Sequence, residues 1–171
     1  EKAAQEVRDI QMTSRAALKQ VRELISGMNA VTVRDELVHA KRILAAAGMQ
    51  MRLEDETDGK PEPAPLVDNM LGMCLREAVT NVVKHSRARL CTIRLSETAD
   101  RMTLSVADDG IGAGSGKTAE DISRNGLRGM RDRLKLVEGD LTFESSADRG
   151  TRVVITVPRV TKTNESEASH P

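Results

Sequence analysis

The stretch LVDNMLGMCLREAVTNVVKHS, residues 66–86, predicts a buried helix that carries one polar ribbon. Its apolar residues recur at helical spacing and form one wide face: Leu71, Cys74, Leu75, Ala78, Val79, Val82 and Val83. Four polar residues share another ribbon at i, i+4 and i+7/8: Glu77, Asn81, Lys84 and His85. An amide oxygen can bind Mg²⁺, and an ammonium group attracts phosphate oxygens. The ribbon is therefore either a metal–phosphate site or the solvated face of an ordinary core helix.

The composition indicates one domain with an appendage and argues against several classes of function. The 171 residues carry 26 Lys and Arg against 26 Asp and Glu, so no charge excess points to nucleic acid or a membrane surface. With one Phe and no Trp or Tyr, the chain has no platform for stacking bases. Cys74 and Cys91 lie among apolar residues, which predicts free thiols in a reducing compartment. No signal peptide or membrane-length apolar run is present, so we expect a soluble fragment.

Residues 2–28 predict one uninterrupted helix, because the first glycine in the chain is Gly27. Apolar and small residues alternate four and three apart, as in a coiled-coil seam: Ile10, Ser14, Ala17, Val21, Leu24 and Met28. Such a seam needs a partner, either an upstream helix or another subunit, unless the arm folds onto its own domain. Because the chain begins at Glu1 without an initiator Met, we expect a piece of a longer protein.

The rest of the pattern predicts helices and half-buried strands. A second helix is expected over residues 32–47, and alternating residues indicate strands at 49–53, 91–95, 102–106, 141–143 and 153–157. The strands at 91–95 and 102–106 form a hairpin in this interpretation. Residues 161–171 read as a polar tail that we expect to be disordered.

The pentad DDGIG at residues 108–112 is a second chemical element. Glycines two apart after a strand-end acid let the backbone pass close to a flat ligand. Asp108 can accept a hydrogen bond from the N6 amino group of adenine, whereas a guanine carbonyl would face an unpaired carboxylate. The pentad alone is a weak indication, because acids and glycines also form turns. A calcium loop is excluded, because its other ligands are missing at the required spacing.

Residues 112–125 are small and polar, which fits either a disordered surface loop or a lid that orders over a ligand. The following NGLRGM, residues 125–130, is expected to open a helix that runs to about Val137. A glycine-rich entry to a helix N-terminus offers free N–H groups and the positive end of the dipole, which together suit a phosphate.

EAVTNVVKH, DDGIG, NGLRGM and a GT pair before a last strand ending in Pro occur in this order, and together they are much more specific than any one alone. Over about residues 32–160 the chain resembles the ATP-binding catalytic domain of sensor histidine kinases of the NarX/DesK class. These belong to a wider family shared with DNA gyrase, Hsp90 and MutL. The resemblance implies an α/β two-layer sandwich, with a mixed sheet covered by helices, after a long coiled-coil-like helix. Residues 1–28 would be the second helix of a dimerisation hairpin, 29–160 the ATP-binding domain and 161–171 a disordered tail.

The resemblance also implies roles for individual residues. Asn81 would be the Mg²⁺ ligand and Glu77 the catalytic carboxylate that orients water or the metal shell. The other ATP contacts would come from Lys84, His85, Asp108, Gly110, Gly112, Gly126, Leu127, Gly129, Met130 and Thr151. Arg124 stands where the family usually has the first glycine of its second glycine box. The lid is then either stiffer than usual or Arg124 itself contacts phosphate.

The implied reaction transfers the γ-phosphoryl group of ATP, with Mg²⁺, to a histidine for relay to a response regulator. That histidine is expected on a dimerisation helix outside this chain, because His39, His85 and His170 are badly placed for the role. The parent would be a homodimer and an integral membrane protein with this part in the cytoplasm, attached only through its missing sensor region. Two alternatives are another ATPase or serine kinase of the same fold, and a dimeric interaction module with a vestigial nucleotide site.

Overall fold

The computed structural model describes residues 2–27, 31–112, 117–147 and 149–159, with the backbone alone for 18–27 and 117–125. By its internal contacts the chain divides into two compact units, residues 1–30 and 31–171. We describe each unit by itself. The division falls two residues after the boundary that the sequence suggested.

The first unit is the helix α1, Lys2–Gly27, which ends at the predicted glycine. Its 26 residues span about 39 Å at the usual rise. Val7, Ile10 and Met12 are exposed, with 54, 65 and 70% of their surface accessible. The side chains of the predicted seam beyond Ala17 lie outside the described residues. None of the described helices is both long and apolar enough to cross a membrane.

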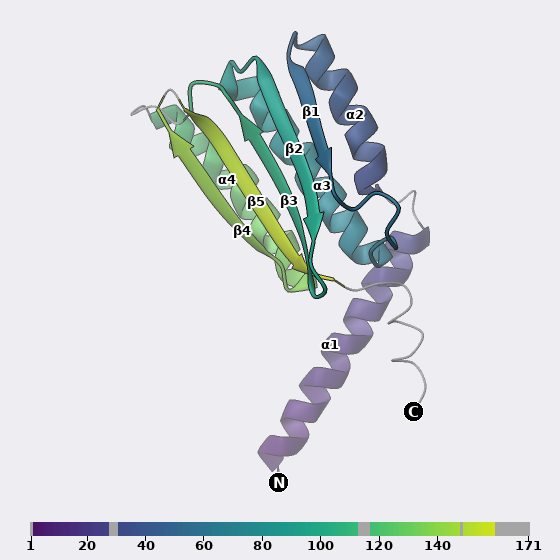
Figure 1. The fold of residues 1–171 in the computed structure, drawn as a ribbon. Helices are drawn as coiled ribbons and strands as arrows, with labels where there is room; N and C mark the ends of the chain where they lie inside the picture. The colour runs from purple at the N-terminus through teal and green to yellow at the C-terminus, as the bar shows by residue number, and fades with distance from the viewer. Residues whose placement is uncertain (1, 28–30, 113–116, 148, 160–171) are drawn as a thin grey trace. The chain divides into compact units, whose positions relative to one another are not determined.

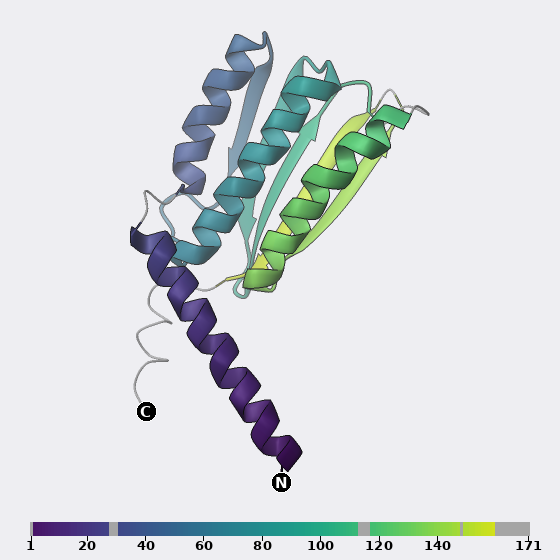
Figure 2. The ribbon, with the colours of Figure 1, turned by 180° about the vertical axis from the view of Figure 1, so that it is seen from behind.

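The second unit is a five-stranded sheet with three α-helices on one face (Figures 1 and 2). The strand order is β1-β2-β3-β5-β4. The strands are β1 Gln50–Asp55, β2 Leu90–Glu97, β3 Arg101–Asp108, β4 Asp140–Ser146 and β5 Gly150–Pro158. β1 is parallel to β2 and every other pair is antiparallel, so the sheet is mixed and mainly antiparallel. The predicted α/β two-layer sandwich is confirmed.

The helices α2 Val33–Ala46, α3 Pro65–Asn81 and α4 Lys117–Leu134 form the second layer. α3 is central, and its apolar face meets the alternate inward residues of the strands. The core includes Leu71, Cys74, Leu75 and Val79 of α3 with Cys91, Ile93, Leu104, Ile155 and Val157 of the sheet. The apolar period of 3.6 on α3 and of two on the strands therefore creates one aliphatic core. Both cysteines are free and buried in it, as predicted.

Two helix ends differ from the sequence prediction. α3 stops being α-helical at Asn81 and continues as a π-helix over Val82–Ser86, closed by Arg87 in the left-handed conformation. α4 begins at Lys117, so the expectation that a helix opens at Asn125 is wrong. Residues 117–125 lack a recurring apolar residue that would have marked a helix, and the glycines just before them made the segment read as a loop.

Candidate functional site

The predicted site residues come together at one end of the sheet. This end is built by the last turns of α3, the π-helix, the end of β3, the start of β5 and the adjoining part of α4. The antiparallel register places Cys91 of β2 opposite Asp108 and Ala107 opposite Arg152 of β5. The first residues of β2 and β5 therefore flank the DDGIG pentad at the end of β3.

Glu77 and Asn81 are both half-buried and meet at α4. A Cβ atom at Gly126 would lie 2.5 Å from Glu77 Oε1 and 3.4 Å from Asn81 Nδ2. The missing side chain of Gly126 thus leaves room for both polar groups between the two helices. Neither side chain makes a hydrogen bond or ion pair with another described residue. Among the described residues, the Glu77 carboxylate and the Asn81 side-chain amide therefore have no partner and can meet a ligand.

Lys84 and His85 lie in the π-helix and are exposed. In an unbroken α-helix, eight residues advance by about 800°, which leaves His85 roughly 80° around the axis from Glu77. An i→i+5 turn contains more residues, so each residue advances less and His85 falls back toward the Glu77–Asn81 line. π-turns often occur at functional sites, and this one changes the predicted straight ribbon at Lys84 and His85.

Asp108 is the buried acid of the site, with 8% of its surface exposed. Its Oδ1 accepts a 2.9 Å hydrogen bond from the Gly110 amide, and the Thr151 amide also donates to this carboxylate. Burial raises the pKa of Asp108, and the two amides offset part of this rise. The carboxylate is thereby held in one orientation by backbone donors from β5 and from its own pentad.

Two glycines let three chain segments approach around Asp108. A Cβ atom at Gly110 would lie 2.1 Å from the Ser86 carbonyl oxygen, and one at Gly150 only 1.9 Å from the Asp108 carbonyl oxygen. Both distances are far shorter than atoms tolerate, and Gly150 also has a φ of +79°. Gly112, with a φ of +63°, approaches the Ser146 carbonyl in the same way. Gly150 was missed by the sequence interpretation, which stressed only the threonine of the GT pair.

The other predicted site residues differ in which of their groups could reach a ligand. Thr151 is the second residue of β5, and its hydroxyl lies 3.2 Å from that of Ser145. Leu127 and Met130 are buried in the aliphatic core, so only their backbone could face a ligand. Gly129 is half-buried, with no atom within 4 Å of an added Cβ. All three α4 positions lie in the helix interior, not at its N-terminus. The Arg124 side chain lies outside the described residues.

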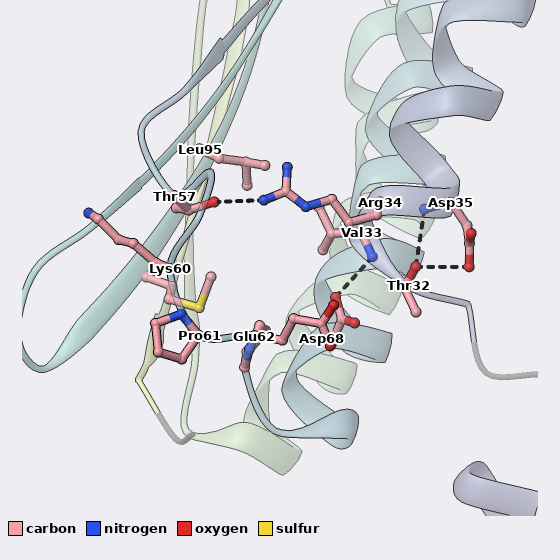
Figure 3. Close-up of a pocket in the computed structure, with 12 residues that line it drawn as sticks. Thr32, Val33, Arg34, Asp35, Thr57, Lys60, Pro61, Glu62, Asp68 and Leu95 are labelled. Atoms are coloured by element: carbon pink, nitrogen blue, oxygen red, sulfur yellow. Dashed lines mark hydrogen bonds between the residues drawn. The ribbon is translucent and has the colours of Figure 1, made fainter. Parts of the chain in front are cut away.

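A cleft of about 320 Å³ opens at the opposite end of β2 and β3, where Leu95 and Met102 lie (Figure 3). It is a poor candidate for a polyphosphate, because its lining places three acids against two cations: Asp35, Glu62 and Asp68 against Arg34 and Lys60. The N-terminus of α2, which could attract an anion, is occupied by Asp68, whose carboxylate accepts a 2.9 Å hydrogen bond from the Val33 amide. The site at the DDGIG end is therefore chemically the better candidate for a polyphosphate.

Residues 67–161 match the family described as histidine kinase-, DNA gyrase B-, and HSP90-like ATPase. The chain belongs to this family. Sensor histidine kinase YvfT of Bacillus subtilis (strain 168) is 43% identical over 162 residues, which are 95% of this chain and 42% of that protein. Sensor histidine kinase DesK of the same organism is 37% identical over 163 residues, with the same two coverages. The chain thus spans about two fifths of the length of these relatives.

Solved structures of histidine kinases share the fold. The histidine kinase domain from the blue-light activated histidine kinase of Erythrobacter litoralis EL346 superposes with a TM-score of 0.62 over 86% of this chain and 74% of that chain. Full-length ShkA, in complex with AMPPNP, has a TM-score of 0.58 over 84% of this chain and 29% of that chain. Their sequence identities of 16 and 19% support the fold alone.

A divalent cation at this site would need phosphate oxygens as ligands in addition to oxygens of the protein. No group of three or more His, Cys, Asp or Glu side chains gathers to hold a metal among the described residues. Mg²⁺ usually takes one or two protein oxygens, keeps several waters and uses substrate phosphates for the rest. The donor set of Asn81 and Glu77, which face the same point on α4, fits this mode.

Proposed function

We propose that this chain is the ATP-binding catalytic portion of a sensor histidine kinase. The observation that carries the proposal is Asp108, a buried carboxylate at the end of β3 that two backbone amides orient. Membership of the ATPase family and the sensor histidine kinases among the relatives support it. The AMPPNP bound by ShkA is consistent with nucleotide binding by this fold.

In this proposal Asp108 reads the adenine base. A buried carboxylate gains a hydrogen bond from the adenine N6 amino group, whereas the guanine O6 atom would leave it unpaired and repelled. Gly110, Gly112 and Thr151 shape the pocket wall around the base. In this proposal, the fixed orientation of the Asp108 carboxylate selects ATP over GTP.

The phosphates extend from this pocket toward the end of α3. Lys84 and His85 offer positive or hydrogen-bonding groups to phosphate oxygens, and Gly126 of α4 lies against Glu77 and Asn81. Asn81 would hold Mg²⁺ through its amide oxygen, with Glu77 orienting its water shell. When bound, Mg²⁺ would neutralise part of the negative charge of the phosphates.

Catalysis then consists mainly of positioning. An imidazole nitrogen of the acceptor histidine attacks the γ-phosphorus, the bond to the β–γ bridging oxygen breaks, and ADP leaves with its electron pair. In this proposal the acceptor histidine lies on a dimerisation helix of the parent protein. In the parent protein we propose a homodimer formed through these helices and relay of the phosphoryl group to a response regulator. The parent would be anchored in the membrane, with this part in the cytoplasm.

Calorimetric titration with Mg²⁺–ATP, with Mg²⁺–GTP as control, tests the proposal. We expect saturable binding of ATP and none of GTP. A folded protein that binds neither nucleotide would identify the module as vestigial, and equal binding of both would remove the role of Asp108. Transfer of labelled phosphate from ATP to an added dimerisation hairpin of the parent protein then distinguishes a histidine kinase from an ATPase of the same fold.

A further inference from the structure

Asp109, the second acid of the pentad, faces away from its neighbour. Asp108 turns toward β5, whereas Asp109 is exposed and turns toward the start of β2. Its Oδ1 atom accepts hydrogen bonds from the backbone amides of Arg89, at 2.8 Å, and Leu90, at 2.9 Å. One carboxylate oxygen therefore ties down two successive amides of another segment.

Asp109 holds the short segment that connects the π-helix to β2. The segment runs through Arg87, which adopts the left-handed conformation, to the first residue of the strand. Two backbone hydrogen bonds reinforce the contact: the Asp109 amide donates to the Leu90 carbonyl at 3.3 Å, and the Ile111 amide to the Ser86 carbonyl at 2.8 Å. The pentad thus grips the turn after the π-helix at both of its ends.

The other end of this turn is also constrained. Ser86 is buried, and its hydroxyl donates to the Val82 carbonyl at 2.7 Å and accepts from the Ala88 amide at 3.1 Å. The exposed residues Lys84 and His85 lie between Val82 and Ser86, the two residues that the Ser86 hydroxyl joins. Because Ser86 closes the π-helix, a fixed position of Ser86 limits where the backbone of Lys84 and His85 can lie.

We infer that Asp109 is a positioning residue that sets Lys84 and His85 at a fixed distance from Asp108. The inference rests on the proposed binding of ATP and adds a division of labour to it. Asp108 reads the base, and Asp109 aligns the groups that meet the phosphates with the base pocket. Hydrogen bonds from the Leu90 and Arg89 amides lower the pKa of Asp109, so the carboxylate is ionised at neutral pH and accepts both bonds at full strength.

The test compares how ATP and adenosine bind to wild type, Asp109→Ala and Asp109→Asn, with NMR or calorimetric titration. In Asp109→Ala we expect adenosine affinity to stay within about twofold, while the affinity advantage of ATP over adenosine falls about tenfold. Asp109→Asn should restore most of that advantage, because its Oδ1 atom can still accept both amides. Asp100→Ala is the matched control, since Asp100 is an exposed acid in the turn at the other end of β3.

Equal loss of adenosine and ATP in Asp109→Ala would overturn the division of labour, and so would unchanged binding of both. A loss of the ATP advantage in folded Asp109→Asn would show that the charge itself acts, which contradicts positioning through hydrogen bonds. If Asp109→Ala does not fold, hydrogen exchange of the wild type decides: the Arg89 and Leu90 amides must be protected. If wild type binds neither ATP nor adenosine, the proposed function itself is refuted. This result differs from every outcome above, because those outcomes concern only the variants of Asp109.

Discussion

At the scale of single residues, two neighbouring acids have opposite environments. Burial raises the pKa of Asp108, while hydrogen bonds from the Leu90 and Arg89 amides lower the pKa of Asp109. Asp108 is the buried last residue of β3, whereas Asp109 lies just past the strand, is exposed and is bonded to the segment before β2. The two identical side chains in DDGIG therefore have different surroundings.

Asp108→Asn tests the acid that reads the base. We expect ATP affinity to fall by about 1.5–3 kcal/mol, the usual value of a hydrogen bond to a charged group, with cooperative unfolding retained. Calorimetric titration gives the affinity and thermal unfolding gives the fold. Affinity equal to wild type would transfer the reading of adenine to another group.

The raised pKa of Asp108 also predicts a pH dependence of stability. Because the folded state holds the proton of Asp108 more tightly than the unfolded state, wild type loses stability as pH rises through the interval between the ordinary pKa of Asp and the raised one. Asp108→Asn does not titrate. The free energy of unfolding of the variant, minus that of wild type, should grow across this interval and then level off in urea unfolding at several pH values. A difference that shrinks with rising pH would contradict the assigned pKa direction.

At the scale of elements, the packing of α4 on α3 separates two glycines that look equivalent in GLRGM. Gly126 faces Glu77 and Asn81, and an added Cβ would displace the flexible end of Glu77. Gly129 has open space around it. One glycine is thus required by the site, whereas the other is not required by any described atom within reach.

The pair Gly126→Ala and Gly129→Ala makes this difference measurable. Both gain helix propensity of about 1 kcal/mol, since both positions are inside α4. We expect Gly126→Ala to weaken Mg²⁺–ATP binding, because its methyl group forces the Glu77 carboxylate to move. Gly129→Ala should raise the thermal midpoint and leave binding unchanged. Should Gly129→Ala lose ATP instead, Gly129 belongs to the phosphate seat that the family resemblance suggested.

At the scale of the whole molecule, the segment that enters the second unit is held directly on α3. Asn69 Nδ2 donates to the Val31 carbonyl at 3.3 Å, and Asp68 Oδ1 accepts from the Val33 amide at 2.9 Å. Gly72 allows this close contact between α3 and the entering segment. A Cβ atom added at Gly72 would lie 3.1 Å from the backbone carbon and oxygen of Thr32. The helix that carries Glu77 and Asn81 is therefore also the helix on which the chain enters this unit.

Gly72→Ala should weaken the contact between the entering segment and α3. Relative to Gly129→Ala, which makes the same change in open space, we expect a free energy of unfolding lower by about 1–3 kcal/mol, as for overpacking in a core. The Val33 amide should also lose protection from hydrogen exchange. Equal stability of the two variants would mean that the entering segment yields to the methyl group without cost.

The sequence by itself determined most of the elements, their order and the family. Periods of 3.6 and two are local properties, so α2, the β2–β3 hairpin and the apolar face of α3 were predictable from spacing. The grouping of Glu77 and Asn81 on one ribbon followed from the same spacing, and the order of the motifs indicated the family that the comparison confirmed.

The tertiary structure alone decided how these residues meet. The π-turn depends on i→i+5 backbone bonds that no side-chain pattern encodes, and the start of α4 lies in a stretch without recurring apolar residues. The approach of Gly126 to Glu77 and the hold of Asp109 on Arg89 and Leu90 join residues that are distant in the chain. Such contacts arise only when the strands and helices pack, because packing, and not local spacing, sets which polar groups lie within hydrogen-bond distance.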